Sequence, residues 1–282
     1  MTAAVREIEV PLSDGRVLHG YDTGRADEFP LIWHHGTPNI GRPPEPLFEV
    51  AARFGMRWVS YDRPGYGGST AHPGRSIGSA ATDVEALADA LGIARFAVVG
   101  HSGGSPHALA CAALLPDRVA AAVTMAGLAP YQAPGLDWYA GMIAAGVSSL
   151  RAAAAGRAAK EAHEASGVEY DPEFTAADLA TLRGNWAWLD SVVGPAVADG
   201  PGPLIDDDLA YVSPWGFDPS RIRAPMLLLH GGQDGIVPAA HSVWLAQACA
   251  TAELRLSPED GHLSILDKAS GAVEWLSQRI KT

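Results

Sequence analysis

The sequence predicts an α/β protein whose central sheet is mostly parallel, with helices on both faces and a helical segment inserted between two strands. Short apolar runs alternate with stretches of helical periodicity over residues 31–127, and the same alternation returns from residue 224 onward. The run at 95–100 is continuously apolar, which is typical of a strand that is buried on both faces. Between about residues 130 and 215 the patterns are helical and contain no such run.

The elements follow one another in a regular order. Two short runs at 6–12 and 17–24, separated by Ser13-Asp14-Gly15, predict a β-hairpin. Further strands are expected at 31–36, 56–62, 95–100, 119–127, 224–232 and 252–258. Helices are expected up to residue 54 and at 79–91, 104–115, 239–250 and 264–280, and in the insertion at 148–165 and at 171–193, the last beginning at Asp171-Pro172.

The change of pattern divides the chain into two predicted domains. Residues 1–129 and 216–282 are expected to form the α/β core, and residues 130–215 are expected to form a helical cap. An insertion at this point would lie over the carboxyl edge of the sheet, where open α/β sheets bind their ligands.

Composition narrows the possible functions. The 282 residues are 48% hydrophobic and 18% charged, which is typical of a globular chain. The net charge of −12 disfavours nucleic acid and anionic membrane surfaces as partners, because both attract clustered Lys and Arg. We expect no membrane span and no secretory signal. Cys111 and Cys249 lie in Ala-rich helical stretches, which predicts two buried free thiols and a cytoplasmic location.

Residues 100–104 fit the pattern G-x-S-x-G between a buried strand and a helix. So sharp a turn holds Ser102 in a strained conformation, and side chains at positions 100 and 104 would clash. The hydroxyl is presented at the N-terminus of the next helix, where free N–H groups favour a developing anion. A glycine-rich turn whose serine only caps the helix would fit the same residues, but the context predicts a nucleophile.

A serine nucleophile needs a base, and the base needs an acid to orient it. His262 follows the last predicted strand and Asp234 follows the strand before it, so both should lie at the same sheet edge as Ser102. The order Ser102, Asp234, His262 fits a catalytic triad. Asp260 is a rival acid that lies too close to His262 in sequence, and the Asp206–Asp208 run is expected to be solvated.

Other histidines are given structural roles. His101 lies on the tight turn, so its side chain is expected to point away from the nucleophile, and His230 is expected to be structural. The adjacent His34 and His35 should point to opposite faces of a strand, which makes a poor chelate. We therefore predict no metal ion and no cofactor.

Acyl transfer develops a negative charge on the carbonyl oxygen, and two preorganised N–H groups commonly stabilise it. We expect one donor at Gly103, directly after the nucleophile, and the other in the loop that follows residues 31–36. Pro38 has no N–H, so Thr37 is the candidate in that loop. An ordinary Gly-Pro loop is the alternative.

These residues together resemble the α/β-hydrolase superfamily. The resemblance rests on HHGTP at 34–38, DRPGYGGS at 62–69, GHSGG at 100–104, Asp234 and the Gly-His pair at 261–262. It implies that substrate binds between the cap and the core. The H-G-x-P turn also resembles haloalkane dehalogenases and epoxide hydrolases, which use an aspartate nucleophile. Here the position holds Ser102, and an alkyl ether on serine has no carbonyl for water to attack, so acyl transfer to water is predicted.

The cap is rich in large aromatic side chains, and some of these could line an apolar pocket. The candidate substrate-binding residues are Trp138, Trp186, Trp188, Tyr211 and Trp215, with Tyr139 as a further aromatic of the segment. Packing between helices is the alternative for each of them.

The favoured function is hydrolysis of a carboxylic ester of a small to medium apolar compound through an acyl-enzyme on Ser102. The same triad could act on an amide, a thioester, a lactone or a C–C bond, or serve a cofactor-free haloperoxidase. A proline iminopeptidase-like enzyme would need an acid in the cap to bind the substrate amine, and the candidates are Glu161, Glu164, Glu169 and Glu173. A binding or rearrangement role on the same fold is the third possibility. The oligomeric state stays open.

Overall fold

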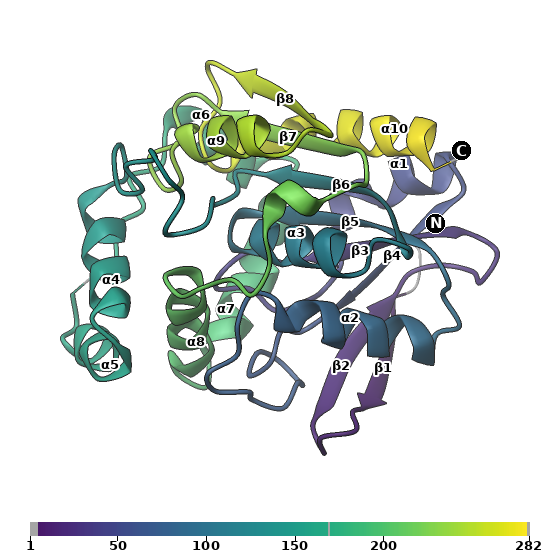
Figure 1. Cartoon of the computed structure of the whole chain (residues 1–282), viewed down its shortest axis with the longest axis horizontal. Helices are drawn as coiled ribbons and strands as arrows, with labels where there is room; N and C mark the ends of the chain where they lie inside the picture. The colour runs from purple at the N-terminus through teal and green to yellow at the C-terminus, as the bar shows by residue number, and fades with distance from the viewer. Residues whose placement is uncertain (1–4, 169, 281–282) are drawn as a thin grey trace.

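The computed structural model describes residues 5–168 and 170–280, and its centre is a sheet of eight strands over those residues (Figure 1). The sheet order is β1-β2-β4-β3-β5-β6-β7-β8. The strands are β1 (Arg6–Pro11), β2 (Val17–Asp22), β3 (Phe29–His34), β4 (Met56–Tyr61), β5 (Phe96–His101), β6 (Val119–Met125), β7 (Met226–Gly231) and β8 (Ala252–Ser257). β1 and β2 form the predicted hairpin, β2 pairs with β4 in the antiparallel sense, and all other pairs are parallel. The predicted α/β fold is therefore confirmed.

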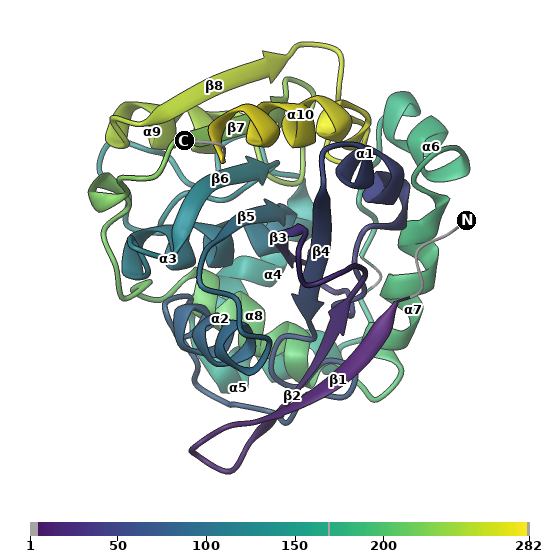
Figure 2. The ribbon, with the colours of Figure 1, turned by 90° about the vertical axis from the view of Figure 1, so that its right-hand side faces the viewer.

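Each face of the sheet is covered by helices (Figure 2). Along β3, Ile32 belongs to one hydrophobic core while Leu31 and Trp33 belong to the other, as the alternation of side chains in a strand requires. The Ile32 side is packed by α2 (Ser79–Ala90), α3 (Ser105–Leu114) and α9 (Ala240–Ala248). The other side is packed by α1 (Phe48–Arg53) and α10 (Ala269–Arg279).

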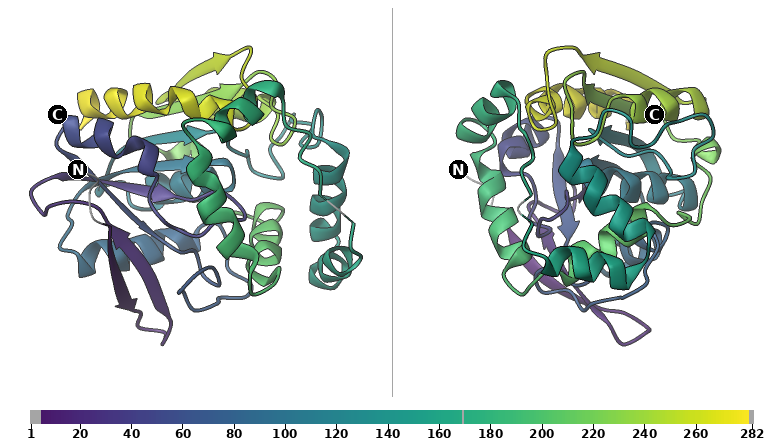
Figure 3. Two further views of the ribbon diagram at one scale, coloured as in Figure 1. Left: turned by 180° about the vertical axis from the view of Figure 1, so that it is seen from behind. Right: turned by 90° about the vertical axis from the view of Figure 1, so that its left-hand side faces the viewer.

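The segment between β6 and β7 is helical, as the sequence predicts, and its described residues contain no strand. Its helices are α4 (Ala144–Ala154), α5 (Arg157–Ala165), α6 (Ala176–Arg183), α7 (Asp190–Val197) and α8 (Gly202–Tyr211). They gather at one end of the sheet, with α4 and α5 standing furthest out (Figure 3). We call residues 130–215 the inserted segment; its treatment as a separate cap domain stays a prediction.

Three helices differ from their predicted limits. The helix expected at 148–165 is broken into α4 and α5 at Gly156, whose φ of 106° is incompatible with a helix. The helix expected at 171–193 is broken into α6, a 3₁₀ turn η3 (Ala187–Leu189) and the start of α7. It begins only after Thr175, which caps α6 in a reciprocal capping box with Asp178. The last helix is preceded by a separate 3₁₀ turn, η5 (Ser264–Lys268).

The strand order places two loops side by side at the carboxyl edge. β3 lies between β4 and β5, so the chain reverses its direction of travel across the sheet at the β3/β5 boundary. Ligands bind at such switch points, because the loops from the two strands diverge there. The loop after β3 carries Thr37, and the loop after β5 carries Ser102.

Candidate active site

The turn after β5 has the geometry that its glycines predict. Ser102 has a φ of 51°, a left-handed conformation that is strained for a residue with a side chain. A Cβ atom on Gly100 would lie 2.7 Å from the Gly104 carbonyl oxygen, and one on Gly104 would lie 2.0 Å from the His34 carbonyl oxygen. Neither position tolerates a side chain without displacement of the backbone.

Ser102, His262 and Asp234 form one chain of hydrogen bonds. The Ser102 Oγ atom lies 2.8 Å from His262 Nε2, and His262 Nδ1 lies 2.8 Å from Asp234 Oδ2. Ser102 and His262 are 160 positions apart in sequence, and Asp234 and His262 are 28 positions apart. The fold of the sheet therefore brings them together. The structure thus joins the three residues that the sequence selected.

Asp234 is held as a carboxylate. Its Oδ1 accepts the backbone N–H groups of Ile236 at 2.9 Å and Val237 at 2.8 Å. Burial alone would raise the pKa of Asp234, but the facing charge of His262 and hydrogen bonds from His230 and His262 outweigh burial, so its pKa lies below the usual value. An ionised Asp234 can accept the Nδ1–H of His262, which leaves Nε2 free to accept the serine proton.

His230 and His101 lie beside this chain. His230 Nε2 is 3.3 Å from Asp234 Oδ2, and its Nδ1 is 2.7 Å from Ser242 Oγ, which fits the structural role predicted for it. The His101 side chain turns toward the backbone of His262, with its Nε2 3.2 Å from the His262 carbonyl oxygen and its ring centroid 5.3 Å from that of His262. Burial, and then the His262 charge, lower the pKa of His101 to about 3, so it is neutral near pH 7.

The two candidate oxyanion donors are neighbours. A Cβ atom on Gly103 would lie 2.5 Å from Thr37 Oγ1, so the Thr37 side chain packs directly against the Gly103 backbone. The Ser105 N–H donates to the Ser102 carbonyl at the start of α3. Because the C=O and N–H of a trans peptide point in opposite directions, the Gly103 N–H points away from α3, and Gly103 and Thr37 both line the cavity described next.

A cavity of about 530 Å³ lies above Ser102, with walls from both the sheet edge and the inserted segment. Ser102 and His262 line it. Most of its other wall residues are apolar, among them Leu128, Leu150, Phe174, Val193, Leu204 and Val237. Of the four acids considered for binding an amine, Glu164 lines the cavity, Glu161 and Glu173 do not, and Glu169 lies outside the described residues.

Four of the five aromatic candidates do not reach this cavity, and only Tyr211 lines it. Trp138 is buried against neighbouring rings and donates its indole N–H to the Ala129 carbonyl at 2.8 Å. Trp215 donates to the Tyr211 carbonyl at 3.1 Å. Trp186 and Trp188 pack edge to face in the core on the α10 side. All four rings are used in packing, and Trp138 and Trp215 also donate their indole N–H groups to backbone carbonyls, so the prediction that these four residues bind substrate is corrected.

The Asp206–Asp208 run is buried, contrary to the prediction that it is solvated. Asp207 is fully buried and pairs with Arg63 at 2.7 Å and Arg75 at 2.8 Å. Asp208 pairs with Lys160 at 2.6 Å, and Lys160 reaches Glu164 at the same distance. Arg63 and Arg75 come from the loop after β4 and Lys160 comes from α5, so no local pattern around residues 206–208 revealed the pairing.

Asp178 is a second acid that the sequence did not single out. It lies on α6, yet its Oδ1 accepts the backbone N–H groups of Leu263 and Ser264, each at 2.8 Å. The inserted segment thereby holds the loop that carries His262. The capping pattern of Thr175 and Asp178 could have been recognised in the sequence, but it does not predict that Asp178 also binds the loop of His262.

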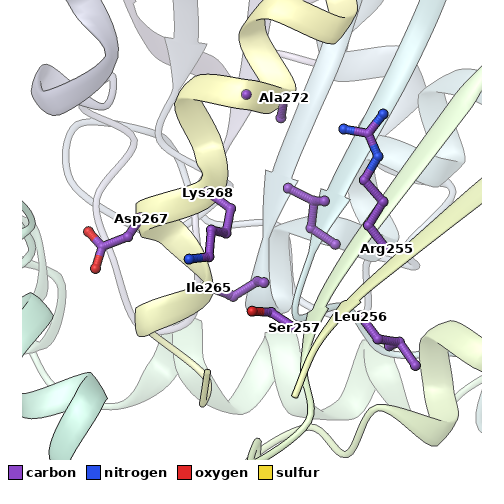
Figure 4. A pocket seen from close by; sticks show the side chains of 9 residues that line it. Arg255, Leu256, Ser257, Ile265, Asp267, Lys268 and Ala272 are labelled. Carbon is purple, nitrogen blue, oxygen red and sulfur yellow. The ribbon is translucent and has the colours of Figure 1, made fainter. Parts of the chain in front are cut away.

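A second hollow, of about 480 Å³, lies between β8 and η5–α10 (Figure 4). Arg255, Ser257 and Lys268 line it together with apolar side chains, and neither Ser102 nor His262 does. Among the described residues no group of three His, Cys, Asp or Glu side chains could hold a metal ion. No described helix is both long and apolar enough to cross a membrane.

Comparison with known proteins agrees with this geometry. A family model described as alpha/beta hydrolase fold matches residues 30–269. The chain is 31% identical to Non-heme chloroperoxidase from Streptomyces lividans over 82% of this chain and 83% of that protein. It is 26% identical to Bifunctional esterase/perhydrolase DCH from Acinetobacter calcoaceticus over 81% and 83% of the two chains. A thermophilic esterase from Thermogutta terrifontis shares the fold, with a TM-score of 0.70 at 19% identity over 98% and 100% of the chains. Because the family model spans the parallel part of the sheet, the inserted segment and the residues of the Ser102–His262–Asp234 chain, this protein belongs to the alpha/beta hydrolase fold family.

Proposed function

We propose that this protein hydrolyses a carboxylic ester of a small to medium apolar compound through an acyl-enzyme on Ser102. The observation that carries the proposal is the pair of 2.8 Å contacts that link Ser102 Oγ to His262 and His262 to Asp234. A serine hydroxyl becomes a useful nucleophile only when such a base accepts its proton.

The proposed reaction has two halves. His262 Nε2 takes the Ser102 proton as Oγ attacks the ester carbonyl, while the N–H groups of Thr37 and Gly103 hold the oxyanion. The intermediate expels the alcohol, which receives the proton from His262, and leaves the acyl group on Ser102. Water then attacks this acyl-enzyme with the same proton transfers, which releases the acid and restores the serine.

The cavity supports the apolar substrate class. Its volume of about 530 Å³ is in the range of small-molecule sites, roughly 300–1,000 Å³. Leu128, Leu150 and Val237 are among the apolar side chains around the nucleophile. An acyl or alcohol part that lacks charge can therefore be desolvated there without leaving a buried charge unpaired.

Two other uses of the same residues have support. Glu164 and Asp208 line the cavity and could bind a substrate amine, as an aminoacyl amide would require. Both carboxylates already contact Lys160 at 2.6 Å, which offsets part of their charge, so the ester takes precedence. The esterase/perhydrolase and chloroperoxidase relatives favour hydrogen peroxide as an alternative acceptor, which would convert the acyl-enzyme to a peracid.

The proposed partner is thus a small apolar acyl compound, with neither nucleic acid nor a membrane involved and no cofactor. The two buried free thiols, Cys111 and Cys249, support a reducing compartment, and we propose the cytoplasm.

Steady-state kinetics on p-nitrophenyl esters of graded chain length test the proposal, with aminoacyl p-nitroanilides as a second series and peroxide added as a third. Turnover of short and medium esters that is lost in Ser102→Ala supports it. Preference for the aminoacyl series, or turnover that survives Ser102→Ala, contradicts it. Peracid formation faster than hydrolysis would assign the acceptor to peroxide.

A further inference from the structure

Arg63 lies directly behind the loop that carries Thr37. It is 1% exposed and comes from the loop after β4. Its guanidinium donates to the carbonyl oxygens of His35 and Gly36, the latter at 3.0 Å, and to Thr37 Oγ1 at 2.8 Å. One planar fork thus binds three consecutive residues, which a lysine ammonium could not do with the same geometry.

These contacts set the direction of the Thr37 N–H. The Gly36 carbonyl is held by Arg63 and also accepts from His35 Nδ1 at 2.8 Å. The Gly36–Thr37 peptide is trans, so its N–H points opposite to that carbonyl and away from Arg63. Within the described residues this N–H has no hydrogen-bond acceptor, while Thr37 itself lines the cavity beside Ser102.

Arg63 is in turn held by the inserted segment. Asp207 on α8 accepts from Arg63 Nη2 at 2.7 Å and from the Thr37 hydroxyl at 2.6 Å. Tyr66 and Arg75 complete the set, with contacts to Asp207 at 3.0 Å and 2.8 Å. A buried guanidinium without a carboxylate partner would be costly, so the position of Arg63 depends on α8 being in place.

We propose that Arg63 and Asp207 are positioning residues that aim the Thr37 N–H at the oxyanion, so that the hole is complete only when α8 is docked on the sheet edge. The inference rests on the proposed function, because it assigns the two residues to the same acyl-transfer step. Without the guanidinium, the carbonyl oxygens of His35 and Gly36 each lose a donor. The Gly36 carbonyl then keeps only the His35 Nδ1 contact, so the Gly36–Thr37 peptide is held less firmly.

The direct test compares the wild type with Arg63→Lys and Asp207→Asn. Asp206→Asn is the matched control, because Asp206 lies next to Asp207 on α8 and pairs with Arg157 instead. We expect kcat to fall by about 10- to 100-fold in the two test variants, with KM within about twofold and Asp206→Asn unchanged, since one oxyanion donor is worth roughly 100- to 1,000-fold.

An alkylboronic acid gives a second readout that a purely structural role would not move. Its adduct on Ser102 is a tetrahedral anion, so its inhibition constant should rise by the same factor as kcat falls. Folded test variants with unchanged kcat, or with reduced kcat but unchanged boronate affinity, would overturn the inference. A wild type that binds boronate without hydrolysing esters would contradict the proposed function alone, and one that does neither would contradict both.

Should Arg63→Lys and Asp207→Asn fail to fold, Thr37 offers a milder pair. Thr37→Val keeps the backbone N–H and the side-chain shape but removes the hydroxyl that joins Arg63 to Asp207, whereas Thr37→Ser retains it. The inference requires weaker boronate binding and lower kcat in Thr37→Val, with recovery in Thr37→Ser. Equal values for the two variants would overturn it.

Discussion

Substitution of Asp178 by Asn tests how the inserted segment holds the His262 loop. Asp178 accepts five hydrogen bonds, three on Oδ1 from Leu263 and Ser264 and two on Oδ2 from Thr175. Asparagine can keep the Oδ1 bonds, but its NH₂ group would face the Thr175 N–H, donor against donor. A lost bond to a charged acceptor costs about 1.5–3 kcal/mol. We therefore expect Asp178→Asn to lower the melting temperature by roughly 2–5 °C.

The rate and the pH dependence give independent readouts. Burial alone would raise the pKa of Asp178, but the backbone N–H groups of Ser264 and Leu263 outweigh it and lower that pKa below 3.8. The carboxylate therefore stabilises the fold above about pH 4, and this contribution is lost as the pH falls through the lowered pKa. The stability difference between wild type and Asp178→Asn should be full at pH 7 and shrink in acid.

The assay measures the melting temperature by differential scanning calorimetry and kcat by steady-state kinetics on the same samples. A His262 ring displaced by about 1 Å can cost up to about 100-fold in kcat. Thr181→Val is the control, because Thr181 also joins α6 to η5, through Asp267 at 2.7 Å, but does not touch the loop of His262. Wild-type melting and kcat in Asp178→Asn, or an equal loss of kcat in Thr181→Val, would refute the reasoning.

Three further predictions follow from the site and its supports. Asp234→Asn should lower kcat by about 10⁴-fold, because an amide there favours the wrong tautomer of His262. Asp260→Asn should keep the wild-type kcat in steady-state kinetics, and a loss of kcat in this variant would show that Asp260 is the acid. Gly104→Ala should prevent folding, because its Cβ would lie 2.0 Å from a carbonyl oxygen. Gly271→Ala has open space around its Cβ in α10 and should raise the free energy of unfolding, measured in urea, by roughly 0.5–1 kcal/mol. Lys160→Met should cost about 3–5 kcal/mol at pH 7 by leaving two carboxylates without their cation, and the deficit should shrink as the pH falls; equal stability at pH 7 would disprove that the ion pair matters.

The fold and the three linked residues could be predicted because their signals are local. Ser102 and Asp234 follow the buried strands β5 and β7, and His262 follows the more exposed edge strand β8. Parallel strands bring their carboxyl ends to one edge of the sheet, so the three residues can meet there. In the folded chain, backbone atoms lie too close to Gly100 and Gly104 for either residue to carry a side chain. The G-x-S-x-G motif predicts this close approach from the sequence alone. Local patterns of this kind can be recognised in the sequence without any knowledge of tertiary contacts.

The contacts of the inserted segment could not be predicted, because their partners are distant in sequence. Asp207 and Arg63 are 144 residues apart, and three consecutive acids with no local cation read as a solvated run. The tryptophans failed for a related reason. A large ring with one N–H suits a pocket or a helix interface equally well. In the structure, Trp138 and Trp215 donate this N–H to backbone carbonyls.

The most direct test of the central claim is intact-mass spectrometry after treatment with a fluorophosphonate, on the wild type and on Ser102→Ala. The reagent needs no knowledge of the natural substrate and reports only whether the serine is activated. We expect one covalent adduct on the wild type and none on Ser102→Ala. A folded wild type that remains unmodified, or an adduct that persists in Ser102→Ala, would contradict it.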